Sequence, residues 1–288
     1  MVMEQKKFTS YDAVVYVLAG SMTILFLMPL LYIIANAFSD PELVYSGKVG
    51  IIPKGFTFEN ILEVFRTKKL VLGLKNTLIY TVLGTAIQLV LQFCLAYPLT
   101  RHDFKGKTFV NLFIAFPMFV SGGMIPTYMV VKELNMLNTM WAIIIPGCIG
   151  LYNVIIIRTY ISSSVPYELT EAATVDGCNV LQCFAKIILP LSKPIVCIMT
   201  LYGIVGYWNS YFNSLLYTTD EKLWPMQRVL QRMLIADAGS TVGTLESMIK
   251  TEGLKYAVIL VSSLPLLVLY PFFQKYFEKG VMIGGIKG

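Results

Sequence analysis

Three residues that could do chemistry lie close together between positions 166 and 190. Glu168, Glu171 and Asp176 supply three carboxylates there, and no histidine or cysteine lies between 168 and 176. Carboxylates that lack an acid–base partner or a nucleophile are poorly suited to catalysis, whereas they can pair with a basic residue of another protein. The stretch therefore predicts a charged recognition surface and no active site.

A short helix must position these carboxylates. Pro166 suits its first turn, where the missing N–H is not needed, and Gly177 suits a left-handed stop. Helical spacing then places residues on two neighbouring faces: Leu169, Ala172, Ala173 and Asp176 on one, and Glu168, Glu171 and Val175 on the other. The small alanines would let a partner approach closely beside the acids.

A second helix follows directly. Asn179 with Gln182 three residues later forms an asparagine version of the capping box. An apolar stripe is expected along it until prolines interrupt the helix, and its members are Leu181, Phe184, Ile187, Ile188 and Leu191. From the pattern alone, the two helices could also form an amphipathic hairpin that lies on a membrane surface.

The rest of the chain is too apolar for a soluble domain, since 56% of its 288 residues are hydrophobic and 14% are charged. No Asp, Glu, Lys or Arg occurs in 13–39, 76–100, 108–131, 134–157, 194–219 or 256–274. Each run can hold a helix of ~20 residues, the length that crosses a bilayer. We predict an all-α integral membrane protein with a single transmembrane domain, 1–288. Its six spans are expected at about 14–37, 74–99, 108–131, 139–161, 195–217 and 256–273, with the loop 162–193 between the fourth and fifth.

Several other functions lack the residues they need. The net charge of +6 comes from scattered loop residues and makes no stripe for nucleic acid. The five cysteines form no CxxC pair and His102 is the only histidine, so neither a metal site nor a disulfide framework is expected. Gly106-Lys107-Thr108 resembles the end of a phosphate-binding loop, but Arg101 replaces the first glycine. We expect no ATP site in this chain.

Polar side chains inside the apolar runs are candidates for a solute path. Asn209 and Asn213 lie four residues apart beside Trp208, and Gln88 and Gln92 form a second such pair. An aromatic ring together with amides suits a sugar, which has both C–H faces and hydroxyl groups. The alternative is that these amides only join helices. Interruptions of the third span, by Pro117, 122–123 and Pro126, favour either a cavity lining or a simple kink.

Residues 171–190 contain several residue types in the order and spacing of a known motif. Glu171-Ala172-Ala173, Asp176-Gly177, Ile187 and Leu189-Pro190 resemble the EAA loop of binding-protein-dependent ABC importer permeases. Six spans, Gly122–Pro126, Asn138-Thr139, the run 206–213 and the Gly-Gly-Ile-Lys-Gly terminus resemble the oligosaccharide branch of that family, and in particular the smaller permease subunit of maltose-type importers.

This resemblance implies a type I ABC importer permease fold, in which the 166–177 helix is a cytoplasmic coupling helix that docks on an ATPase. Glu171 would pair with a basic ATPase residue, with Glu168 beside it. The resemblance gives the close packing to Ala172 and Ala173, and the sharp turn to Asp176 and Gly177. Gly284, Gly285 and Lys287 would form a second ATPase contact, although a glycine-rich tail also suits a frayed end.

The resemblance also implies the partners. They are a second EAA-bearing permease in a heterodimer, two ATPase subunits that carry ATP and magnesium, an extracytoplasmic solute-binding protein, and an oligosaccharide substrate. The chain would be a multi-pass protein of a bacterial cytoplasmic membrane with both termini inside, and it would not itself be an enzyme.

Two alternatives remain at this point. The solute of such a permease need not be a sugar. A self-contained secondary transporter or channel is the other candidate, but it would need charged residues within the membrane, and the six runs contain none.

Overall fold

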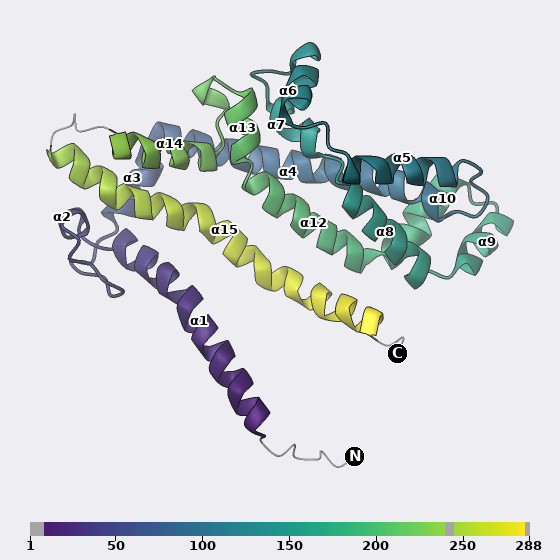
Figure 1. The fold of residues 1–288 in the computed structure, drawn as a ribbon, viewed down its shortest axis with the longest axis horizontal. Helices are drawn as coiled ribbons and strands as arrows, with labels where there is room; N and C mark the ends of the chain where they lie inside the picture. The colour runs from purple at the N-terminus through teal and green to yellow at the C-terminus, as the bar shows by residue number, and fades with distance from the viewer. Residues whose placement is uncertain (1–8, 240–244, 286–288) are drawn as a thin grey trace. The chain divides into compact units, whose positions relative to one another are not determined.

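The computed structural model describes residues 9–239 and 245–285, and these fold into helices without any strand (Figure 1). The first part of the chain forms α1 (Ser10–Ala37), α2 (Pro41–Tyr45), α3 (Glu59–Arg66), α4 (Lys68–Ala96), η1 (Pro98–Thr100), α5 (Lys107–Phe119), α6 (Met124–Glu133), α7 (Met140–Ile144), η2 (Ile145–Gly147) and α8 (Leu151–Ser164). The second part forms α9 (Tyr167–Val175), α10 (Val180–Cys183), η3 (Phe184–Ile188), α11 (Leu189–Leu191), α12 (Lys193–Trp208), α13 (Tyr211–Tyr217), η4 (Glu221–Leu223), α14 (Met226–Gly239) and α15 (Leu245–Gly285). The predicted all-α class is confirmed.

Three stretches of helix are long and apolar enough to cross a membrane without a break: α1, α4 with η1, and the 245–274 part of α15. Three further pairs of helical segments meet the same criteria only when taken together across a bend. The bends are 118° between α5 and α6, 50° between 140–147 and α8, and 84° between 180–191 and α12. The described residues therefore allow between three and six spans.

The span 108–131 is interrupted at the residues where the sequence predicted interruptions, and the span 139–161 has a break that the sequence analysis did not predict. In the first, α5 ends at Phe119 just after Pro117, and Gly123 has a φ of +85°, which no helix accommodates. In the second, Pro146 lacks the N–H that a helix would donate at that position, and the chain passes through η2 and a non-helical stretch to Gly150 before α8 begins.

The predicted span 195–217 is wrong as a single helix. The α12 helix ends at Trp208, and α13 begins three residues later at Tyr211. Asn209 and Ser210 occupy the break, and the Asn209 amide Nδ2 donates to the Val205 carbonyl at 2.9 Å. Side chains of this kind compete for backbone hydrogen bonds, which explains the break although the run contains no proline there.

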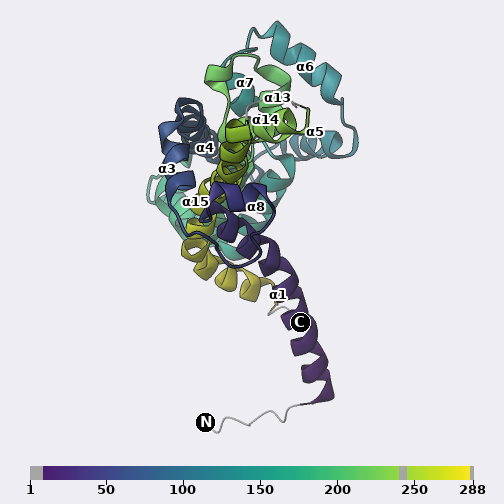
Figure 2. The same cartoon turned by 90° about the vertical axis from the view of Figure 1, so that its left-hand side faces the viewer.

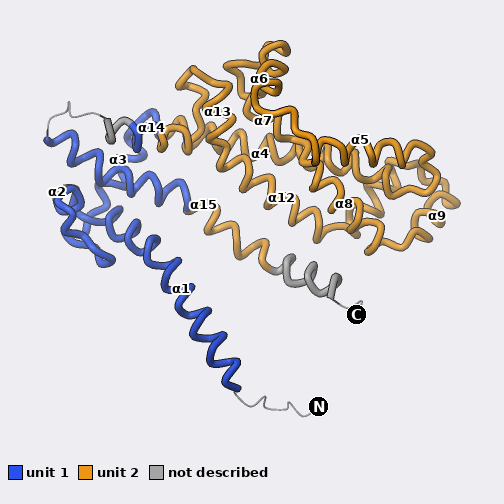
Figure 3. Tube along the Cα trace, viewed as in Figure 1, with its two compact units in different colours: residues 1–70, 232–263 blue, residues 71–231, 264–288 orange. Residues whose placement is uncertain are grey.

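The described chain divides into two compact units, 1–70 with 232–263 and 71–231 with 264–288 (Figure 3). In the first unit a small core lies where α1 ends, and its buried members are Ala35, Val44 and Val49. Asn60 of α3 is buried and donates to the carbonyls of Ala37, at 3.3 Å, and Ser39, at 2.8 Å. The rings of Tyr32 and Tyr256 meet edge to face with centroids 5.8 Å apart.

The α1 helix has almost no protein cover within its own unit. From residue 14 to 34 its large apolar side chains are exposed on every side, and the helix contains no charged residue after Asp12. A 28-residue helix that is apolar all round is stable in lipid or against apolar partners and not in water. This helix therefore indicates a membrane environment.

The second unit is built along α4. Figure 1 shows α4 running from the α13 and α14 end of this unit to the end that holds α9 and α10, and Figure 2 shows α6, α7 and α13 gathered at the former end. One core cluster joins the C-terminal part of α4 to α5, α8, α9, α10 and α12, and a second joins Tyr80 of α4 to α7 and α12. Near its N-terminal end, Asn76 donates to the Lys222 carbonyl at 2.7 Å and the Trp224 carbonyl at 3.1 Å. The helix is thus held by contacts along its length.

Glycines allow α4 and α12 to approach closely. A Cβ added at Gly203 of α12 would lie 2.8 Å from Cγ2 of Thr85, and one added at Gly84 of α4 would lie 2.7 Å from the Tyr207 ring. Small residues at such crossings are typical of helix packing within membranes.

We expect Gly203→Ala to destabilise the protein, because the Thr85 side chain would have to move and overpacking costs ~1–3 kcal/mol. Gly206→Ala is the matched control, since a Cβ there meets nothing within 4 Å and both changes gain the same helix propensity. Thermal unfolding in detergent should place the Gly203→Ala midpoint several degrees below that of Gly206→Ala, since ~1 kcal/mol corresponds to roughly 2–4 °C. Equal midpoints would contradict this close packing.

Candidate functional site

A helix lies where the sequence places the cluster of carboxylates. The α9 helix begins directly after Pro166 and ends at Val175, two residues before Gly177, which has a φ of +81°. The Gly177 N–H donates to the Thr174 carbonyl at 3.1 Å and the Cys178 N–H donates to the Ala173 carbonyl at 2.9 Å. These two bonds form a Schellman motif, which requires the left-handed residue that glycine supplies.

The three carboxylates all face outward. Glu168, Glu171 and Asp176 are exposed, and Glu171 makes no hydrogen bond or ion pair with any residue that the structure describes. Around them the apolar side chains Leu169 and Val175 are 41% and 87% exposed. A face that combines free carboxylates with uncovered apolar groups is typical of a surface that another protein covers.

The two alanines expected to admit a close approach differ in exposure. Leu169 and Ala172 do not share the burial of Ala173: only Ala173 and Thr170 of α9 face the core. The reason is that α9 rests on the unit through a narrow stripe, since a nine-residue helix at the end of the bundle has few neighbours. Ala172 therefore belongs to the outward face, together with the acids.

The second predicted helix is present with its cap. The Asn179 side chain accepts from the Gln182 N–H at 2.9 Å, and the Gln182 side chain accepts from the Asn179 N–H at 3.0 Å. The predicted apolar stripe is only partly buried, since Leu181 is 76% exposed while Ile188 is buried. A π-helical turn at Phe184–Ile188 shifts the register between these two positions, and no sequence pattern marked that turn.

A polar cavity of ≈ 300 Å³ lies at the breaks in the helices of the second unit. Gln88 contributes to its wall from α4 and Gly147 from the break after α7. The other lining residues come from the end of α12 and from α13, and they are Gly206, Tyr207, Asn209, Ser210, Phe212 and Asn213. The Ser210 Oγ is buried and has no hydrogen-bond partner in the described protein.

The residues predicted for the solute path divide between this cavity and the core. Asn209, Asn213 and Gln88 line the cavity together, although Asn209 lies in the break and Asn213 on α13, so the two asparagines do not share one helix face. Trp208 is 2% exposed and does not line it. The prediction for Trp208 is therefore wrong within this chain, because the end of α12 turns the indole into the protein.

Amide and phenol groups bond the backbone that the helix break at 145–150 leaves free. The Ile144 carbonyl accepts from the Tyr207 hydroxyl at 3.0 Å and the Ile143 carbonyl from the Asn213 amide at 3.4 Å. The Gln92 amide donates to the Cys148 carbonyl at 3.4 Å. Asn213 thus both joins helices and lines the cavity, so the two roles considered for this residue do not exclude each other. Sequence reasoning missed Tyr207 and Ser210, which lie in the same run as the asparagines.

The remaining predicted site residues lie near the end of the chain. Gly284 and Gly285 are the last residues of α15, and Lys287 lies outside the described residues. Within the described residues, no group of three or more His, Cys, Asp or Glu side chains could hold a metal ion.

Comparison with known proteins decides the family. Residues 95–283 match the model of the family described as the binding-protein-dependent transport system inner membrane component. The chain belongs to this family. It is therefore a membrane protein, and the matched range includes both the α9 surface and all the residues of the polar cavity except Gln88.

Relatives and a solved structure support this assignment over nearly the whole chain. Protein LplC of Bacillus subtilis is 42% identical over 93% of this chain and 91% of its own length. The polygalacturonan/rhamnogalacturonan transport system permease protein YtcP of the same organism is 36% identical, covering 96% and 98%. A crystal structure of a bacterial ABC transporter involved in import of the acidic polysaccharide alginate contains a chain with a TM-score of 0.87 and 28% identity, covering 96% of this chain and all of that one.

We expect Gly177→Ala to loosen the end of α9, because an alanine in the left-handed region costs ~1–2 kcal/mol while nothing lies within 4 Å of the added Cβ. Gly177→Asn should be milder, since asparagine tolerates this conformation better. Hydrogen exchange at the amides of 177 and 178 should be faster in the alanine variant than in the asparagine variant. The same protection in wild type and both variants would contradict the role given to this glycine.

Proposed function

We propose that this chain is a transmembrane permease subunit of an ATP-driven importer for oligosaccharides, and that it forms half of the translocation path. One observation carries the proposal: a single compact unit contains both an outward-facing acidic helix and a polar cavity at the breaks of its apolar helices. The first suits an energy-supplying partner and the second suits a polar solute.

The solute class rests on the cavity and on the relatives. Two asparagines and one glutamine provide hydrogen-bond donors and acceptors. Tyr207 and Phe212 provide aromatic surface for the C–H faces of a sugar ring. YtcP is named for polygalacturonan and rhamnogalacturonan transport, and a relative from Halalkalibacterium halodurans that is 28% identical is named for arabinooligosaccharides.

The topology follows if each bent pair is one span. Six spans then place both termini on the side of α9, which we assign to the cytoplasm of a bacterial cell. Non-helical backbone within a membrane is tolerated where it is buried in protein or lines a water-filled cavity. The breaks at 145–150 and 209–210 both contribute residues to the wall of the polar cavity.

Coupling is assigned to α9. Its carboxylates and the small Ala172 would enter a cleft of an ATPase subunit, where Glu171 pairs with a basic residue. ATP and magnesium would be bound by two such subunits, and the complex would be completed by a second permease chain and an external solute-binding protein. A second ATPase contact by Gly284, Gly285 and Lys287 remains a prediction.

The test is to reconstitute the wild-type complex in proteoliposomes and to measure import of oligosaccharides presented by the binding protein. Import should require all partners and ATP. Glu171→Lys should insert and assemble with the second permease normally, since a change at an exposed site usually costs within ~0.5 kcal/mol. It should abolish import, because two like charges would meet at the ATPase.

Glu133→Lys is the matched control, since it makes the same charge change at an exposed position at the end of α6. An acidic substitution at the basic ATPase partner should restore part of the activity of Glu171→Lys, as expected for a direct pair. Import by Glu171→Lys at the wild-type rate would remove the coupling role of α9. Import by this chain without its partners would contradict the proposed function itself.

A further inference from the structure

We name residues 167–188 the coupling segment. The turn that follows α4, residues 97–103, contacts this segment on both sides of Gly177. The His102 ring stacks on the ring of Tyr167, the first residue of α9, with centroids 4.0 Å apart and an interplanar angle of 16°. The Tyr97 ring packs on Phe184, just beyond α10, at 5.1 Å and 34°. We name these four residues the aromatic clamp.

The turn itself is held firmly. Arg101 donates from Nε at 2.8 Å and from Nη2 at 2.7 Å to the Asp103 carboxylate, and from Nη1 to the Tyr97 hydroxyl at 3.5 Å. The guanidinium also holds the pKa of the Asp103 carboxyl below its ordinary value. Thr100 Oγ1 donates to the Tyr97 carbonyl at 2.7 Å, and Tyr97 is 5% exposed. The two rings that the turn contributes to the clamp therefore have a fixed base.

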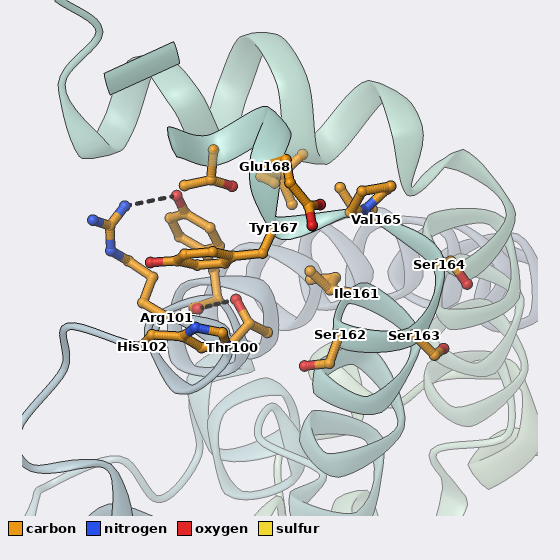
Figure 4. A pocket seen from close by; sticks show the side chains of 14 residues that line it. Thr100, Arg101, His102, Ile161, Ser162, Ser163, Ser164, Val165, Tyr167 and Glu168 are labelled. Carbon is orange, nitrogen blue, oxygen red and sulfur yellow. Dashed lines mark hydrogen bonds between the residues drawn. The ribbon is translucent and has the colours of Figure 1, made fainter. Parts of the chain in front are cut away.

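Beside the stack the packing is open. A cavity of ≈ 330 Å³ lies between the turn, the end of α8 and the start of α9, and Tyr97, Arg101, His102 and Tyr167 are among its lining residues. Figure 4 shows the Tyr167 ring lying over His102 at the edge of this space. On this side, the ring stack is thus a discrete contact and not part of a continuous core.

The turn is joined to the wall of the polar cavity through α4. Its first residue, Tyr97, follows the last residue of α4, and α4 is one unbroken helix from Lys68 to Ala96. Gln88, on the same helix, lines the cavity. Nine residues of helix span ~13.5 Å, so a displacement of the turn along α4 is passed to the cavity wall over a short rigid distance.

We propose that His102 and Tyr167 are positioning residues that transmit movement of the coupling segment to α4, and through it to the cavity wall. This inference rests on the proposed function. The helices α8 and α12 are joined to the coupling segment covalently and pass on movement in any case. The buried core also joins the end of α4 to α9 and α10, and the stack adds to it a discrete contact between two packed rings at the start of α9. Loss of the stack should therefore weaken coupling without stopping transport.

The test is the amount of sugar imported per ATP hydrolysed in the reconstituted complex. In His102→Ala and in Tyr167→Ala this ratio should fall by roughly 2- to 10-fold, the range expected for loss of one aromatic pair, while ATP hydrolysis continues. His102→Phe and Tyr167→Phe keep a ring and should retain the wild-type ratio. Phe113→Ala is the matched control, because it removes one ring of the exposed stacked pair Phe109–Phe113 on α5 and should leave the ratio unchanged.

Three results would overturn the inference: a wild-type ratio in His102→Ala, an equal loss in His102→Phe and His102→Ala, or a collapse of complex yield in both alanine variants. The second would assign the role to an imidazole nitrogen, and the third would make the stack a folding contact. A wild-type complex that imports no oligosaccharide would instead refute the proposed function, so the two failures can be told apart.

Discussion

The apolar stretch 140–164 is interrupted between α7 and α8, and the interruption leaves backbone carbonyls without helical hydrogen bonds. The arrangement of the second unit depends on the side chains that donate to these carbonyls. A helix that breaks inside a membrane leaves carbonyl groups without partners, and each costs several kcal/mol if lipid surrounds it. Here the carbonyls of Ile143, Ile144 and Cys148 accept hydrogen bonds from Asn213, Tyr207 and Gln92. These donors come from three other helices, so the break is stable only while α4, α12 and α13 surround it.

The same requirement explains why polar side chains meet at the cavity. Asn213 satisfies the broken backbone and faces the cavity, and Gln88 stands one turn from Gln92 on α4. The glycine contacts between α4 and α12 bring these groups within reach of one another. A transported sugar would thus meet amides and hydroxyls that the fold already needs, and their hydrogen-bonding capacity can be shared between backbone and solute.

Much of this could be predicted from the sequence, because the strongest signals are local. The charge-free runs predicted the three unbroken spans, and the cap residues Asn179 and Gly177 predicted the turn between α9 and α10. The break after Trp208 could not be predicted, because it depends on competition between the Asn209 side chain and the helix backbone. The burial of Trp208 and of Ala173 depends on which neighbours surround a helix, and periodicity does not encode that. The stack of His102 on Tyr167 joins segments 65 residues apart and left no pattern in either.

The central claim is that the cavity bearing Asn209 forms part of the path of the imported sugar. It is tested most directly by a cysteine at position 209 in a complex in which the five native cysteines of this chain have been replaced and the partner subunits contain none. During ATP turnover, the rate of modification by a water-soluble thiol reagent would be compared with loaded and with sugar-free binding protein. The account predicts modification with the sugar-free protein and clear protection with the loaded one. The same rate in both conditions, or no modification in either, would contradict it.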